Sequence, residues 1–448
     1  MKRYGATLVL LGVAAMLGVY LFLVDTPRQR EREAEQERAS RVVDLKEDQL
    51  KGLDLVTKNG RIALERVGTD SWRMTAPLAS EVDEGAVRRL VTQLTTLSVM
   101  RSVENLGNLA EVGLDHPGVR VTARTATGET ILEFGNPNPT GSGVYVRRGD
   151  QKVFLVDQSA KTTFDVAPYD LRKKEFLGFD QSTVTAVAAT SGGQPLRLER
   201  RQEAWSILDP PVAADPDTVS SLLSRLRALK ALEFFDTPEQ RRAVSLAASP
   251  KTSIELTAGG HTLTVAFFDA RPPRPDGIYA RTGPDDLYRV SGSLLNEMPL
   301  TVSALRDMRL ARILPHTVRG LAITTPSERY QLTRKDASAA WELDQQPLGS
   351  DAAHQANEFL DAVLLLKGES VVAETLDRVP ATAFAAPAAR IELQAEDPKS
   401  STTISIGAAS GERRYAYSGS SGPVFLIPSD LLGRIPTRSS LQPGKASK

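Results

Sequence analysis

The sequence predicts an α+β protein in which an N-terminal transmembrane helix precedes three tandem repeats, each an antiparallel sheet with one main amphipathic helix. Three observations predict it: an uncharged apolar run near the N-terminus, features that recur about every 134 residues, and alternating strand patterns joined by tight turns. The 448 residues suffice for about three domains. Apolar residues at 41% and charged residues at 25% are ordinary globular values, so the composition excludes a wholly disordered chain.

Charge and cysteine content exclude several classes of function. The 55 Lys and Arg balance the 55 Asp and Glu, so no basic excess indicates a nucleic-acid partner. The chain has no cysteine, which excludes disulfides, thiolate catalysis and cysteine-based metal sites.

The chain begins with a candidate membrane anchor. Residues 4–24 carry no charge and would reach about 31 Å as a helix, enough to cross a hydrocarbon core. Lys2 and Arg3 precede the run and favour a cytoplasmic N-terminus. A cleaved signal peptide is the competing interpretation, but its small-residue site would fall near residues 13–15, well before the apolar run ends. We therefore expect residues 1–27 to be a cytoplasmic tip and an uncleaved single-pass anchor that contacts the bilayer through residues 4–24.

A charged spacer is expected over residues 28–44. Opposite charges stand at helical spacing in residues 28–41, where each pair adds a few tenths of a kcal/mol to an isolated helix. We interpret the segment as a solvated spacer that lifts the folded part off the bilayer. Contact of its arginines with lipid headgroups is the alternative.

Three tryptophans mark the internal repeat: Trp72, Trp205 and Trp341. Each follows a strand-like segment and precedes first a proline and then an acidic residue that can open a helix. Those acids are Asp83, Asp215 or Asp217, and Asp351. The three segments that follow have the apolar spacing of a helix packed on a sheet. Their apolar stripes are Val87, Leu90, Val91, Leu94 and Leu97; Val219, Leu222, Leu223, Leu226 and Leu229; and Ala356, Phe359, Leu360, Val363 and Leu366.

After each helix a proline precedes four strands. The prolines are Pro117, Pro250 and Pro387, and the last strand pair of each repeat starts with Tyr145, Tyr279 or Tyr415. Each unit is therefore predicted as three strands, a helix, four strands and a short helix. The predicted domains are 45–180, 181–315 and 316–441, followed by a flexible tail at 442–448.

The first repeat carries recognisable motifs. They are Trp72, Gly113-Leu-Asp-His-Pro117, Leu132-Glu-Phe-Gly135 and Tyr145-Val-Arg147. These motifs resemble those of the bacterial domain of unknown function 4340 family, and the resemblance is closest over residues 50–175. Members of that family look like membrane-anchored envelope proteins, often encoded beside an ABC-type transporter of the gliding-motility class. The resemblance implies a place in the bacterial inner membrane, with the bulk of the chain on the periplasmic side and an ABC-type permease or other envelope proteins as partners. The resemblance to this family implies no catalytic residues.

No motif in the chain predicts catalysis. The four histidines fall at different places in their repeats, and no Gly-x-Ser-x-Gly elbow or phosphate loop is present. Polar residues also differ between the copies. We therefore expect no enzyme activity, no cofactor, and no catalytic, cofactor-binding or metal-binding residue.

The best polar candidates are Arg172 and Arg306, which end the first two repeats, whereas the third repeat has Gln442 near its end. Each arginine either caps its short helix or pairs with a carboxylate between repeats, or it docks a partner protein. The loops at 134–143 and 271–277 occupy the same place in two repeats. They are either a recognition edge or ordinary connections.

The sequence thus predicts a non-catalytic, membrane-anchored extracytoplasmic accessory subunit of an ABC-type transporter or a related envelope complex, acting through protein–protein interaction. The alternative is a free-standing envelope binding module for polysaccharide, peptidoglycan or lipid. A glycan binder needs exposed aromatic platforms, and aromatic residues make up only 6% of this chain.

Overall fold

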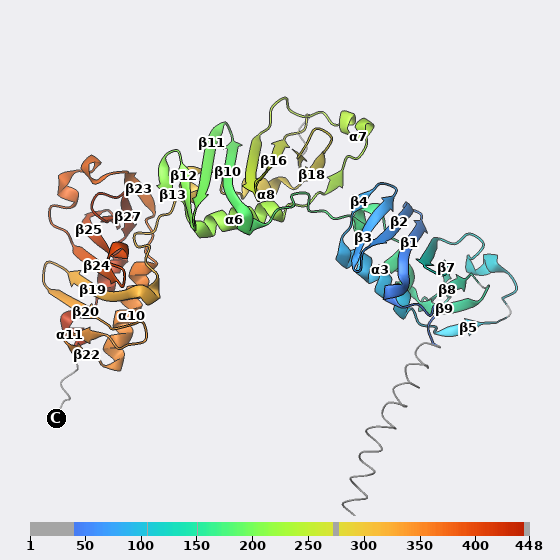
Figure 1. The fold of residues 1–448 in the computed structure, drawn as a ribbon, viewed down its shortest axis with the longest axis horizontal. Helices are drawn as coiled ribbons and strands as arrows, with labels where there is room; N and C mark the ends of the chain where they lie inside the picture. The colour runs from blue at the N-terminus through green and yellow to red at the C-terminus, as the bar shows by residue number, and fades with distance from the viewer. Residues whose placement is uncertain (1–39, 105, 150, 272–276, 443–448) are drawn as a thin grey trace, which may run out of the picture. The chain divides into compact units, whose positions relative to one another are not determined.

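The computed structural model describes residues 40–104, 106–149, 151–271 and 277–442. These residues form three antiparallel sheets of nine strands, and one longer helix lies across each sheet (Figure 1). The prediction of repeated sheets, each with one main helix, is confirmed. The expected anchor at 4–24, most of the spacer and most of the tail lie outside the described residues. Among the helices that are described, none has the length and apolar character needed to cross a membrane.

The first sheet has the strand order β4-β3-β2-β1-β6-β7-β8-β9-β5. Its strands are β1 (Leu50–Thr57), β2 (Gly60–Val67), β3 (Ser71–Ala76), β4 (Ser80–Glu81), β5 (Arg101–Val103), β6 (Val119–Thr125), β7 (Glu129–Pro137), β8 (Gly143–Arg148) and β9 (Val153–Asp157). Its helices are α3 (Glu84–Thr96), α4 (Gln158–Phe164) and α5 (Pro168–Leu171).

Helix α3 forms where the sequence has an N-terminal capping residue followed by a stripe of apolar residues. Asp83 precedes the helix, and its side chain accepts a hydrogen bond from the backbone N–H of Ala86. Val87, Leu90 and Leu94 are buried in the core of the first repeat. Burying a side chain of this size stabilises the fold by about 1.5–3 kcal/mol. The stripe therefore determines which face of α3 packs on the sheet.

The second sheet repeats the order, β13-β12-β11-β10-β15-β16-β17-β18-β14. Its strands are β10 (Val184–Ser191), β11 (Gln194–Arg201), β12 (Ala204–Leu208), β13 (Pro211–Ala213), β14 (Glu233–Phe234), β15 (Thr252–Ala258), β16 (His261–Phe268), β17 (Ile278–Arg281) and β18 (Tyr288–Val290). Its helices are α6 (Pro216–Arg227), α7 (Pro238–Ala243), α8 (Gly292–Asn296) and α9 (Val302–Leu305). Of the two acids expected to open α6, Asp215 accepts from the N–H of Asp217, so Asp215 is the cap.

The third sheet has the order β22-β21-β20-β19-β24-β25-β26-β27-β23. Its strands are β19 (Val318–Thr324), β20 (Arg329–Thr333), β21 (Glu342–Leu343), β22 (Gln346–Pro347), β23 (Ser370–Ala373), β24 (Ala389–Ala395), β25 (Thr402–Ser410), β26 (Arg413–Ser418) and β27 (Val424–Pro428). Its helices are α10 (Ser350–Leu364) and α11 (Arg438–Leu441). Asp351 lies in the first turn of α10, which follows Gly349 and has no side-chain cap. Trp341 is fully buried and donates from Nε1 to Asn357 on α10 at 2.8 Å.

The structure adds two short strands to each predicted repeat. These are β4 and β5 and their counterparts β13, β14, β22 and β23, which lie at the two edges of each sheet. Strands of two to four residues are too short to show an alternating pattern, so the sequence carried no signal for them. The first core also begins earlier than expected. Val42 and Val43, placed at the end of the predicted spacer, are buried with the side chains of the first repeat.

The repeated tyrosines have a common role outside the main cores. Each lies in a smaller apolar cluster with a residue in the neighbouring strand or directly before it: Tyr145 with Val153, Tyr279 with Leu287, and Tyr415 with Val424. Gly135 lies beside the first of these clusters, where an added Cβ would collide with the backbone oxygen of Val112. The glycine of the Leu132–Gly135 motif is therefore required by close packing of two backbone segments.

The described residues group into two compact units. Among these residues, the first unit comprises those within 40–179, 225–250 and 265–297, and the second comprises 180–224, 251–264 and 298–442. Arg172 belongs to the first unit and Arg306 to the second, so each unit holds one candidate site. The predicted domain boundaries near 180 and 315 stay predictions.

Candidate functional site

Arg172 follows α5 and forms the first site. Its backbone bridges to Val82, and its Nη1 donates to Oδ2 of Asp236 at 2.7 Å. The guanidinium carbon lies 3.7 Å from the ring centroid of Phe234, so the cation also stacks on an aromatic face. We name these side chains, with Tyr169, the Arg172 site.

Aromatic rings fill the Arg172 site. Tyr169 donates its hydroxyl to the backbone oxygen of Ala231 at 3.1 Å, and its ring lies 6.1 Å from that of Phe234. Tyr288 contacts Phe234 edge-on at 5.8 Å and stacks on Phe176 at 4.6 Å. Burial raises the pKa of Tyr288. The site is thus a packed apolar cluster with one ion pair at its side.

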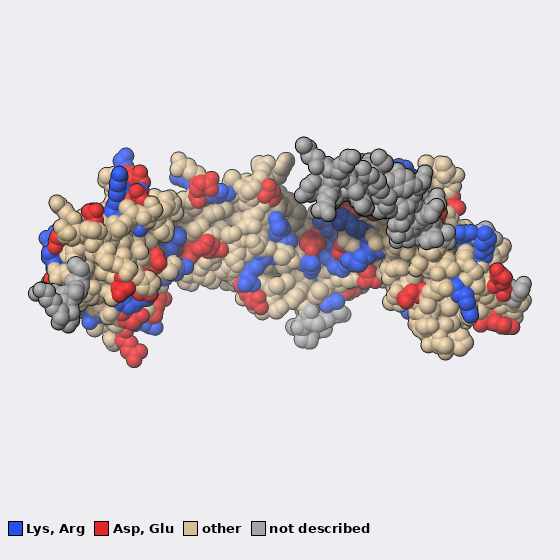
Figure 2. Space-filling view, turned by 90° about the horizontal axis from the view of Figure 1, so that it is seen from below, with Lys and Arg blue, Asp and Glu red and all other residues tan. Residues whose placement is uncertain are grey.

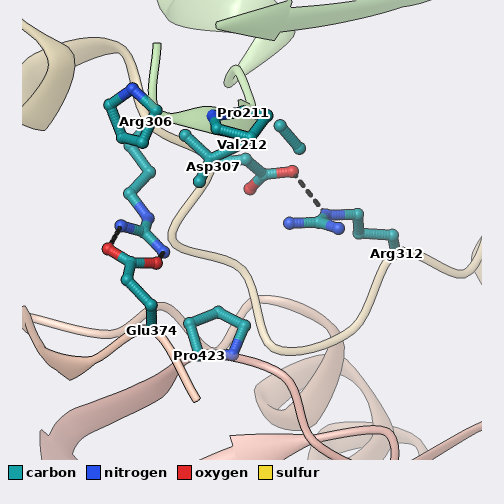
Figure 3. A pocket seen from close by; sticks show the side chains of 9 residues that line it. Pro211, Val212, Arg306, Asp307, Arg312, Glu374 and Pro423 are labelled. Atoms are coloured by element: carbon teal, nitrogen blue, oxygen red, sulfur yellow. Dashed lines mark hydrogen bonds and ion pairs between the residues drawn. The ribbon is translucent and has the colours of Figure 1, made fainter. Parts of the chain in front are cut away.

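Arg306 follows α9 and forms the second site. Its Nη1 and Nη2 donate to Oε1 and Oε2 of Glu374, both at 2.7 Å, as the paired dashed lines in Figure 3 show. Such a two-fold contact matches the planar guanidinium fork to the carboxylate. Arg306 is 8% exposed. Its hydrogen bonds hold the pKa of Glu374 below the usual glutamate range.

Asp307 extends the second site. Only 3% of the residue is exposed, and both carboxylate oxygens accept from Arg309, each at 2.9 Å. Arg312 donates to Oδ2 at 2.8 Å (Figure 3). Burial alone would raise the pKa of Asp307, but these hydrogen bonds and the two cations lower it below the usual range. We name Arg306, Asp307, Arg309, Arg312 and Glu374 the Arg306 site.

The Arg172 site and the Arg306 site lie at equivalent places in the fold, as their backbone hydrogen bonds show. Leu171 accepts from the N–H of Asp83 at 2.9 Å, and Leu305 accepts from the N–H of Asp215 at 2.8 Å. Each arginine is therefore the next residue after a backbone contact with the cap of a main helix. Lys367 adds a side-chain contact in the second unit, where its Nζ lies 3.1 Å from Oδ2 of Asp215.

The acids also lie at similar places in the fold. Each follows the edge strand β14 or β23, whose preceding residue donates its N–H to the neighbouring strand: Leu232 to Arg289 and Glu369 to Leu426. In the first sheet, Met100 makes the same bond to Leu155, and Glu104 stands at the matching place. The described residues give Glu104 no ion pair. The third repeat has Gln442 where the first two have an arginine, so it has no guanidinium to make this ion pair.

The structure decides which atoms the two candidate arginines bind. Each pairs with a carboxylate of the following repeat, which was one of the two structural alternatives; docking of a partner stays a prediction. Sequence reasoning missed Asp236, Glu374 and Phe234. The available signal was an acid recurring just after the second tryptophan-marked helix and again after the third, at positions 236 and 374.

The other candidates give no assembled site in the described part of the chain. His116, His261, His316 and His354 are exposed at separate places. No three His, Asp or Glu side chains among the described residues gather as a metal site. The loop at 134–143 is held by its own hydrogen bonds, including Asn138 to Thr140 at 2.9 Å, and most of the 271–277 loop lies outside the described residues. On the face visible in Figure 2, positive and negative side chains are interspersed.

A family model described as "Domain of unknown function (DUF4340)" matches residues 72–248 and 210–383. The chain belongs to the DUF4340 family. The first match includes both Arg172 and Asp236, and the second includes both Arg306 and Glu374. The DUF4340 unit therefore runs from one sheet into the next and contains the arginine–carboxylate contact. No curated protein and no solved structure matches the chain significantly.

Proposed function

We propose that this DUF4340 protein is a non-catalytic, membrane-anchored extracytoplasmic accessory subunit of an ABC-type transporter or a related, gliding-motility-like envelope complex. It acts through protein–protein contacts. The observation that carries the proposal is the repetition itself: one nine-stranded sheet is built three times. Repeated sheets present repeated edges and loops to an extended or repeated partner, as tandem-repeat proteins do.

The chemistry of the Arg306 site supports a structural role for its polar groups. Asp307 accepts hydrogen bonds on both oxygens, and both oxygens of Glu374 accept from Arg306. Side chains engaged in this way hold neighbouring segments in place. The apolar run at residues 4–24 supports attachment to a membrane.

The test is purification of the full chain from its native membranes in mild detergent, followed by identification of proteins that co-purify in stoichiometric amounts. We expect a permease and an ATPase subunit. A single-pass protein of unrelated sequence, carrying the same tag, serves as the control for detergent carry-over. Recovery of the chain alone would contradict the proposal. Retention on insoluble peptidoglycan or on envelope polysaccharide would instead favour the free-standing binding module.

A further inference from the structure

A cavity beside Arg306 is about twice the size of its counterpart beside Arg172. The cavity beside Arg172 has a volume of about 320 Å³, and the one beside Arg306, the Ser303 cavity, has about 630 Å³. We propose that the Ser303 cavity receives an aromatic side chain, Tyr or Phe, from a partner protein. This inference names the contact made by the subunit proposed above and rests on that function for the identity of the partner.

The walls of the two cavities correspond at several positions, although Leu300 and Met308 line only the larger one. Each is lined by a proline after the repeat's tryptophan, by the arginine and its acid, and by the edge strand that precedes the acid. In the first unit these are Pro77, Arg172, Asp236, Glu233 and Phe234, and in the second Pro210, Arg306, Glu374, Ser370 and Val371. The larger cavity is thus the same place in the fold with different side chains in it.

Two substitutions between the repeats remove large side chains from the wall of the larger cavity. Tyr169 stands three residues before Arg172, and Ser303 stands three residues before Arg306. Phe234 pairs in register with Tyr288, and Val371 pairs with Phe425 at the same place in the third sheet. Where the first unit has two aromatic rings, the second has a hydroxymethyl and an isopropyl group. An aromatic side chain fits because, in this same chain, aromatic side chains occupy the equivalent volume.

The lining of the Ser303 cavity suits such an occupant. Leu300, Val302, Met308 and Val371 contribute apolar wall, and Arg306 and Glu374 contribute charged groups. Ligand sites of this volume are typically apolar with a few fixed polar groups, and a methionine adapts its shape to a ring. Arg172 shows that the guanidinium at this position stacks on an aromatic face, at 3.7 Å from the ring centroid.

The experiment uses the full chain in detergent, with ¹³C-methyl-labelled methionine and N-acetyl-tyrosinamide as the probe. Met308 lines the Ser303 cavity and Met74 lines the smaller one, so the protein carries a reporter and an internal control. We expect the Met308 methyl signal to shift saturably, with a Kd on the order of 1 mM for a ligand of this size. Met74 should stay unmoved, and N-acetyl-leucinamide should bind at least several-fold more weakly.

Exchange of residues between the two sites gives the matched variants. Ser303→Tyr with Val371→Phe transplants the rings of the first site and should abolish the Met308 shift. Tyr169→Ser with Phe234→Val should make Met74 respond to the probe instead. Thermal unfolding verifies that each variant folds, and Val371→Phe alone is the fallback if the double variant does not. A Met308 signal that never shifts, or that shifts equally in the filled variant, would overturn the inference.

Failure of this inference and failure of the proposed function are distinguishable. If the wild-type chain co-purifies with transporter subunits but the probe does not bind, only the cavity assignment is wrong. If the chain purifies alone but binds the probe, the proposed function is wrong and the inference of an aromatic-binding cavity still holds. Loss of the transporter subunits from the filled variant, with its fold intact, would support both.

Discussion

Arg306 and Glu374 meet through two parallel hydrogen bonds of 2.7 Å, at the place in the fold where Arg172 meets Asp236. The partners are 68 residues apart in one case and 64 in the other. Each contact joins the end of one repeat to the edge strand of the next. The family match extends across each contact, which makes the contact part of the repeated unit.

Removal of the Arg306 guanidinium should destabilise the chain. Arg306→Ala leaves Glu374 unpaired, but the side chain of Glu374 is 47% exposed and regains water. We therefore expect a loss of about 1–3 kcal/mol in the free energy of unfolding. Urea denaturation measures it. Arg306→Lys is the matched variant that keeps the charge but not the fork, and it should recover less than half of the loss. Equal stability of all three proteins would contradict a structural role for the pair.

Acid should weaken the Arg306 site. In the folded chain, the pKa values of Glu374 and Asp307 lie below those of ordinary carboxyl groups. The carboxyl groups of an unfolded chain titrate at about 4. The stabilisation is therefore fully present above about pH 5 and is lost as the pH falls through the lower, folded values. Unfolding free energies measured from pH 7 to pH 3 test this. The Asp307→Asn variant should show a shallower fall; a fall as steep as that of the native chain would exclude Asp307 as its source.

Gly135→Ala should destabilise the first repeat. The added Cβ would collide with the backbone oxygen of Val112, and backbone cannot move aside as a flexible side chain can. We expect a cost of about 1–3 kcal/mol, typical of overpacking, measured by thermal unfolding. Gly107→Ala is the control, because its added Cβ meets no atom within 4 Å. Equal effects at the two glycines would show that close packing at Gly135 is not the reason for the residue.

The three cores should respond separately to large-to-small substitutions. Leu94, Leu226 and Val363 are each fully buried in a different repeat. Leu94→Ala, Leu226→Ala or Val363→Ala should each cost about 1–5 kcal/mol, with the valine near the low end. Calorimetry of the full chain should show one transition shifted by each variant and the others nearly unchanged. Fragments cut near residues 180 and 315 should fold alone. A single transition shifted equally by all three variants would mean that the repeats form one cooperative unit.

The anchor proposed at residues 4–24 predicts a defined topology. The protein should keep its N-terminus and remain in the membrane fraction after a high-salt wash, because residues 4–24 carry no charge. Protease added to spheroplasts should degrade everything beyond about residue 25. Protection of the C-terminal repeat would reverse the orientation, and a mature N-terminus near Met16 would show that the segment is a cleaved signal.

The amino-acid sequence by itself determined the repeat, the strands and main helix of each copy, and where most of these helices and strands begin and end. These depend on short-range physics: alternation places Val119 and Val121 on one face, and Asp83 caps α3 through an N–H only three residues away. Only the tertiary structure decided the edge strands of two to four residues, the partners of Arg172 and Arg306, and the Ser303 cavity. The edge strands are too short to show an alternating pattern. The two arginine–carboxylate pairs join groups 64 and 68 residues apart in the chain, and no local pattern records that the fold brings them together.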